Sequence, residues 1–158
     1  MFREMTRKDR ALGEEEIGKI IHNCSYGVLS LLSENGYPYG VPVNYAYVNG
    51  TFIIHGTNGR SHKLDCIRSH DKVCLTIVDK QELIREEYTT MYTSVIVFGK
   101  AVIPEDPQEK MQAMLEMMGE LAPEALEKVR DHCVRQSDGY AMILITPEHI
   151  TGKAKTTL

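Results

Sequence analysis

Residues 26–55 read YGVLSLLSENGYPYGVPVNYAYVNGTFIIH, three β-rich runs separated by two short polar turns. The turns are Glu34-Asn35-Gly36 and Asn49-Gly50, and Asn-Gly is typical of a tight β-hairpin turn. We therefore expect three consecutive antiparallel strands, Tyr26–Ser33, Tyr37–Val48 and Thr51–His55.

Two prolines, Pro38 and Pro42, lie in the second of these strands. Proline has no backbone N–H to donate to a neighbouring strand, so this strand is expected at a sheet edge or with an irregularity near the prolines. Its free backbone groups would then be available to another partner.

The remaining β-rich runs lie further along the chain. Lys72–Asp79 predicts a fourth strand, Tyr88–Ile103 a central strand in which Val95–Phe98 are buried on both faces, and Tyr140–Ile145 a last strand before a polar tail. The charged stretch Lys80–Glu87 is expected to interrupt the β structure.

Four helices are predicted between these strands. Apolar residues recur at helical spacing in Glu14–Cys24, and Ser61 is a suitable N-cap for a short helix ending at Arg68. Asp106 is placed to cap a helix that begins with proline, and Pro123 opens another. The methionines of the helix after Asp106 are interpreted as core residues rather than as a cofactor site.

These elements predict a mainly β (α+β) fold, a six-stranded antiparallel β-barrel with flanking helices. The 158 residues are expected to form one domain, 1–158, with an N-terminal arm at 1–12 and a helical excursion at 106–136. Side chains fill the interior of so small a barrel, so a ligand should bind outside it or between two copies. A homodimer is therefore expected.

Composition argues against several classes of protein. The net charge is −4, which gives no overall attraction to nucleic acid or to an anionic membrane. The opening residues are polar and the longest apolar run, Ala141–Ile145, is too short to cross a bilayer, so a soluble cytoplasmic protein is expected. The four cysteines form no C-x-x-C pair and the histidines lack the spacing of metal ligands, so no metal site is expected.

The segment with the most chemical information is His55–Lys63, HGTNGRSHK. It joins a strand end, a glycine loop and a helix start, where backbone N–H groups favour a bound phosphate. Ser61 could donate a hydrogen bond, and Lys63 or Arg60 could supply positive charge. The alternative is an ordinary surface loop followed by a capped helix.

Several blocks of the chain resemble one known family. The matching blocks are MFREM (1–5), GYPYGVPVNY (36–45), FIIHG (52–56), SHKL (61–64) and TSVIVFGKA (93–101). In order and spacing they are similar to the pyridoxamine 5′-phosphate oxidase-like split-barrel flavoproteins, and within them to the nitroimidazole-resistance, or nitroimidazole reductase-like, branch.

The resemblance implies FMN as cofactor, shared between the two subunits of a homodimer. It implies a phosphate site at Ser61, His62 and Lys63, and a strand beside the flavin at Pro42, Val43, Asn44 and Tyr45. It also implies that His55, at a strand end and followed by Gly56, contacts substrate or donates a proton, and that the partner subunit contributes Thr93 and Ser94. From the residues alone, Val43 and Tyr45 fit barrel packing equally well, and His55 fits a hydrogen-bonded histidine at a strand end.

The function so implied is an FMN-dependent oxidoreductase. It would reduce a small organic acceptor, such as a nitroimidazole or nitroaromatic, with electrons from NAD(P)H. The oxidases that give the family its name end in an Arg-Leu-x-Pro motif, which Ile150–Leu158 lacks, so oxidation of pyridoxamine phosphate is not expected. The alternatives are a non-catalytic flavin- or haem-binding protein of the same fold and a purely structural domain.

Overall fold

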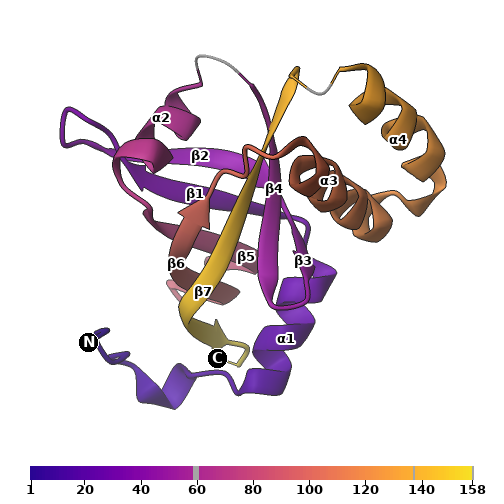
Figure 1. Cartoon of the computed structure of the whole chain (residues 1–158). Coiled ribbons are helices and arrows are strands. Elements are labelled where there is room, and N and C mark those ends of the chain that lie inside the picture. Colours follow the sequence, from indigo (N-terminus) through magenta and orange to yellow (C-terminus); the bar gives the residue numbers. More distant parts are fainter. Residues whose placement is uncertain (59–60, 137, 158) are drawn as a thin grey trace.

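The chain forms a curled antiparallel sheet of seven strands with four α-helices around it, as described by a computed structural model of residues 1–58, 61–136 and 138–157 (Figure 1). The strands are β1 (Tyr26–Leu32), β2 (Pro38–Asn44), β3 (Ala46–Val48), β4 (Thr51–Thr57), β5 (Lys72–Ile84), β6 (Thr89–Val102) and β7 (Tyr140–Lys155). The helices are α1 (Glu14–Asn23), α2 (His62–Ser69), α3 (Pro107–Leu121) and α4 (Leu126–Arg135), with 3₁₀ turns η1 (Lys8–Arg10) and η2 (Pro123–Ala125).

The strand order across the sheet is β2-β1-β5-β6-β7-β4-β3. The two outermost strands, β2 and β3, are consecutive in the chain and are joined only by Tyr45. The sheet therefore curls so far that its two outermost strands, β2 and β3, are adjacent at Tyr45. The predicted edge position of the proline-bearing strand is confirmed, because β2 pairs only with β1 in the described part of the chain.

The prediction of six strands is wrong, because the run Tyr37–Val48 is two strands. Its first half pairs with β1 and its second half pairs with β4, so the backbone must change direction between them. Tyr45 makes this change: its side chain is buried and its hydroxyl donates to the Ile21 carbonyl at 2.9 Å. The Tyr45 N–H donates to the Ser25 carbonyl, also at 2.9 Å, outside either ladder.

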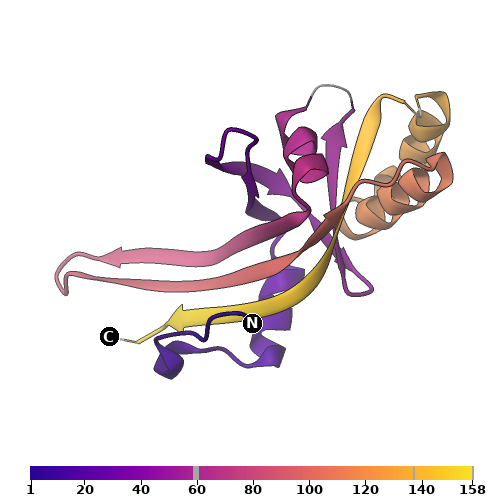
Figure 2. The ribbon, with the colours of Figure 1, turned by 60° about the vertical axis from the view of Figure 1, so that its left-hand side comes forward.

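Two strands continue further than their composition predicted. The stretch Lys80–Glu87 was expected to break the β structure, but β5 runs to Ile84 and forms a long hairpin with β6 that projects from the rest of the molecule (Figure 2). Likewise, β7 includes the predicted polar tail and ends at Lys155. Pairing with β6 extends both neighbours, because a backbone ladder forms whether or not the side chains are apolar.

The central position predicted for Tyr88–Ile103 is confirmed, since β6 is the fourth of seven strands. Burial on both of its faces is not found. Val95 and Val97 are fully buried, whereas Ile96 and Phe98 are 37% and 39% exposed. Alternate side chains of a strand point to opposite faces, so β6 has one face in the core and one on the surface.

Two apolar clusters hold the fold together. The larger one fills the curl of the sheet, and its fully buried members include Leu29, Phe52, Ile54, Leu75 and Ile143. In the smaller one, α3 and α4 pack on the outer side of β3, β4 and β7, through residues such as Met114, Met117, Cys133, Ile53 and Met142 (Figure 1). The helix pair therefore covers β4 from outside the curl.

The predicted helix starts are found close to their expected positions. Asp106 caps α3 with its side chain, which accepts from the N–H groups of Gln108 and Glu109. Ser61 precedes α2 as expected, although its hydroxyl makes no capping hydrogen bond. No helix in the described residues is long and apolar enough to span a membrane.

Candidate functional site

The candidate site lies where the curled sheet is not closed by hydrogen bonds. Strands β2 and β4 are in contact, yet in the described residues β2 pairs only with β1, and β4 only with β3 and β7. The edge of β2 that faces away from β1 therefore keeps its backbone groups free of any ladder. This edge forms one side of a pocket.

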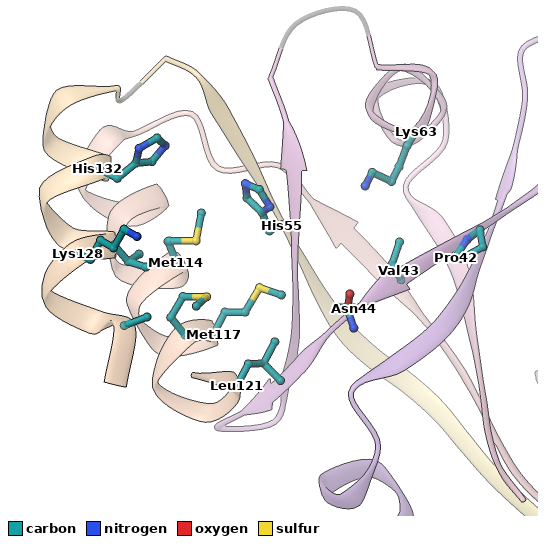
Figure 3. Close-up of a pocket in the computed structure, with 13 residues that line it drawn as sticks. Pro42, Val43, Asn44, His55, Lys63, Met114, Met117, Leu121, Lys128 and His132 are labelled. Atoms are coloured by element: carbon teal, nitrogen blue, oxygen red, sulfur yellow. The ribbon is translucent and has the colours of Figure 1, made fainter. Parts of the chain in front are cut away.

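The pocket has a volume of about 730 Å³ and lies between β2, β4, α2 and the α3–α4 pair (Figure 3). Its sheet side is polar and basic, and its helix side is mostly apolar and rich in methionine. The lining residues are Pro42, Val43, Asn44, His55, Lys63, Met114, Met117, Met118, Leu121, Ala125, Lys128, Val129 and His132.

Lys63, in the first turn of α2, extends toward β4 and lines the pocket. Its side chain is partly buried, and this burial lowers the pKa of the ammonium group. Within residues 1–58, 61–136 and 138–157, the Lys63 ammonium has no hydrogen bond or ion pair. A partly buried cation without a counter-charge favours an anionic ligand.

Gly56 leaves room for this lysine. A Cβ atom built on Gly56 would lie 3.3 Å from Lys63 Nζ and 3.5 Å from its Cε, which is close contact. The glycine at the end of β4 thus lets the lysine side chain lie against the strand backbone. Even an alanine Cβ here would require the end of the Lys63 side chain to shift by a few tenths of an ångström.

His55 lies at the centre of the pocket wall, on the outward face of β4 (Figure 3). Burial is the main cause that lowers the pKa of His55, and the positive fields of Lys63 and His132 lower it further. The neutral imidazole is therefore favoured at neutral pH. An anion bound beside these cations would oppose their effect and raise the pKa again.

The charge of the pocket differs from that of the chain. The net charge of the chain is −4, but the lining contains two lysines and two histidines and no carboxylate. On the helical wall, Met114, Met117 and Leu121 offer apolar and polarisable surface. Such a pocket suits a ligand that has an anionic group and a flat apolar part.

A model of one protein family matches nearly the whole chain. The family is described as pyridoxamine 5′-phosphate oxidase, and the match covers residues 13–154. The chain belongs to the pyridoxamine 5′-phosphate oxidase family. A comparison with curated proteins finds no match.

Solved structures of low sequence identity share the fold of this family member. A candidate 5-nitroimidazole antibiotic resistance protein from Bacteroides thetaiotaomicron is 21% identical, with a TM-score of 0.71 over 90% of this chain and 85% of that one. The flavocytochrome Anf3 from Azotobacter vinelandii is 16% identical, with a TM-score of 0.82 over 98% and 73%. An FAD- and haem-binding protein from Mycobacterium smegmatis is 14% identical, with a TM-score of 0.75 over 92% and 72%.

Within the pyridoxamine 5′-phosphate oxidase fold, the structure brings together about half of the residues expected from sequence. Those that line the pocket are Pro42, Val43, Asn44, His55 and Lys63. Gly56 adjoins it through Lys63, and Ser61 precedes α2 without lining it. Arg60, the alternative source of charge, lies outside the described residues.

Tyr45 and His62 are placed differently. Tyr45 points into the core, and burial raises the pKa of its hydroxyl, so its side chain takes the packing role that the residues alone also allowed. His62 Nε2 lies 3.0 Å from Ser33 Oγ, and its ring packs against Tyr39 with centroids 4.6 Å apart. Neither residue lines the pocket.

Thr93 and Ser94 lie on β6, away from the pocket of their own chain. Ser94 and Ile96 lie two residues apart and share the outer face of the sheet, whereas Thr93 is on the same face as the buried Val95. Of these two residues, only Ser94 lies on the outer face of the sheet.

Sequence reasoning missed the whole helical wall of the pocket. The methionines Met114 and Met117 do pack in the core as expected, but they also line the pocket, together with Met118. Lys128 and His132 were not predicted as site residues. Their spacing of four residues in an amphipathic helix places them on one face, which was an available signal.

Proposed function

We propose that this chain is an FMN-dependent reductase of a small organic acceptor, acting as a split-barrel homodimer with cofactor bound in the pocket. The observation that carries the proposal is a pocket lined by no carboxylate of the described residues, in which His55 and Lys63 lie opposite a methionine-rich helical wall next to the start of α2. Family membership and the neighbours described as flavin- or haem-binding support the same class of ligand.

The residues present fit a flavin phosphate. Lys63 supplies an unpaired ammonium within the described residues, and Gly56 keeps space for it. The Ser61 hydroxyl makes no capping hydrogen bond, and N–H groups in the first turn of a helix have no partner within that helix, so both could bind an oxyanion. These groups would hold the phosphate by charge-assisted hydrogen bonds.

The residues also fit a flat ring. The free edge of β2 at Pro42–Asn44 offers backbone donors and acceptors, and Met114, Met117 and Leu121 offer apolar surface on the other side. Together they would orient the ring and exclude water from it. Bound FMN would supply hydride and electron transfer, which no side chain of this pocket provides.

His55 is the residue that we assign to proton supply. Its pKa is lowered by burial and by the charges of Lys63 and His132. A phosphate paired with Lys63 would remove part of this repulsion, so the imidazolium form would become more populated near neutral pH. His55 could then hold a proton and donate it to the acceptor as that acceptor is reduced.

The outer face of the sheet supports the proposed homodimer. Exposed apolar side chains gather there on β1, β5 and β6: Tyr26, Val28, Val78, Ile96 and Phe98. The pairing register joins Pro42 to Val28, Val28 to Thr76, and Thr76 to Ile96, so this face is continuous with the pocket. A second copy seated on the face would cover these side chains and offer its Ser94 beside the pocket.

Binding of FMN is tested with protein as purified and with two lysine variants. Wild type should show the paired absorption bands of flavin and release FMN on denaturation. Lys63→Ala should weaken FMN binding about tenfold or more, because a charge-assisted hydrogen bond is lost. Lys19→Ala, at an exposed position of α1 that does not line the pocket, is the matched control and should bind as wild type.

Two outcomes would contradict the flavin site. One is a colourless protein whose melting temperature does not rise when FMN is added. The other is equal FMN affinity in the Lys63 and Lys19 variants.

The second candidate is a flavin or haem carrier without turnover. It is favoured by His55 and His132, which line one pocket and could ligate haem iron. A Soret band in the purified protein would support haem. For a flavin-loaded protein, bleaching by NADPH without oxygen, followed by recovery when a nitroimidazole is added, would support the reductase over the carrier.

A further inference from the structure

A second pair of basic side chains lines the pocket on the wall opposite Lys63. Lys128 and His132 lie four residues apart in α4 and therefore share one face of that helix. Figure 3 shows them on the other side of His55 from Lys63. In the part of the chain that the structure describes, neither side chain has a hydrogen bond or ion pair.

The surroundings of this pair favour an anionic ligand. No carboxylate lines the pocket, so the two side chains have no counter-charge inside it. The charge of His132 contributes to the lowered pKa of His55, which means that its field extends to the centre of the pocket. Val129 and Met118 also line the pocket, so the pair adjoins apolar surface.

We propose that Lys128 and His132 form an anion subsite that selects acceptors carrying a carboxylate over neutral ones. This inference rests on the proposed function, in which Lys63 and the start of α2 hold the cofactor phosphate. Lys128 and His132 would then be available to bind the charged group of a second ligand. The acceptor would lie with its carboxylate toward α4 and its reducible group near His55.

The test compares two probes that share a nitrobenzene ring and differ in charge, 4-nitrobenzoate and 4-nitrobenzyl alcohol. Their affinities for the purified protein are measured by titration calorimetry, and the flavin content of each preparation is recorded. Wild type should bind the carboxylate about tenfold more tightly than the alcohol. The double variant Lys128→Ala/His132→Ala should lose this preference.

A matched control is present in the same helix. Arg130→Ala removes one positive charge from an exposed position of α4 that does not line the pocket, and it should keep the preference. Lys128→Glu reverses the charge and should weaken 4-nitrobenzoate binding more than Lys128→Ala does, with the alcohol unchanged. All three positions are exposed, so folding should be retained, and melting temperatures check this.

The outcomes separate this inference from the proposed function. A preference that persists in the double variant overturns the anion subsite. Loss of flavin from the double variant, to the extent seen for Lys63→Ala, also overturns it, because the pair would then belong to the cofactor site. If the preference and its loss occur in a protein that binds no flavin, the subsite is supported and the proposed function fails.

Discussion

At the scale of single residues, the chemistry of the pocket depends on His55. Its imidazole lies among positive charges and is partly removed from water, and both conditions disfavour its protonated form. The same residue is our candidate proton donor. Its protonation state therefore links ligand binding, stability and the proposed reaction.

The lowered pKa of His55 predicts how stability depends on pH. In the unfolded chain, histidine titrates near about 6.5, above its pKa in the folded pocket. Between these two values the unfolded state binds more protons, so the free energy of unfolding should fall as the pH falls. In the His55→Gln variant, the free energy of unfolding should decrease less between about pH 7.5 and about pH 5.5 than it does in wild type. Urea unfolding of the ligand-free protein at these two pH values measures the difference.

His70→Gln is the control for this measurement, since His70 is exposed at the end of α2 and does not line the pocket. It should retain the dependence of wild type. An equal pH dependence in the His55 and His70 variants would refute the electrostatic account of the pocket.

At the scale of elements, the α3–α4 pair converts an outer strand surface into a pocket. Helix α3 begins where Asp106 accepts from the N–H groups of Gln108 and Glu109, at 2.9 and 3.0 Å. Its buried methionines then pack against β3, β4 and β7. This cap stabilises the start of the helix that carries the apolar wall opposite His55.

Removal of the α3 cap should therefore weaken both the fold and the pocket. Asp106→Ala leaves two helix N–H groups without their acceptor and should lower the free energy of unfolding by about 1 kcal/mol. Denaturant unfolding measures this. Glu105→Ala, at the adjacent exposed acidic position, should change stability by less than about 0.5 kcal/mol. Equal effects at the two positions would mean that the cap contributes nothing.

At the scale of the whole molecule, the two faces of the sheet differ in how they are covered. Its concave face is filled by the large apolar cluster, and its outer face is covered by α3 and α4 only around β3, β4 and β7. Over β1, β5 and β6, apolar side chains are left exposed, including Ile96 and Phe98. This is the face on which we place the second subunit.

A charge on that face should separate the subunits. Ile96→Lys is expected to shift the protein from dimer to monomer in analytical ultracentrifugation, because a buried lysine without a partner is costly. Flavin content should fall with it, since the proposed pocket is completed by the partner. Val134→Lys changes an apolar residue that is 70% exposed on α4 and should affect neither. A monomeric wild type that binds FMN fully would refute the shared site.

The local features of this protein could be predicted from its sequence. The turns at Glu34–Gly36 and Asn49–Gly50 and the helix start at Asp106 depend on neighbouring residues, so their physics is contained in short segments. The same holds for Lys63, whose place in the first turn of α2 follows from the helix start. The family resemblance is likewise a property of the sequence.

Contacts between distant segments determined where the strands begin and end and how the pocket is formed. The break at Tyr45 arises because one half of the run pairs with β1 and the other with β4, and β5 and β7 extend because β6 pairs along their length. The pocket wall is a further case, since His132 faces His55 only after α3 and α4 have packed on β4. Burial and pairing depend on which surfaces meet, and no short stretch of sequence carries that information.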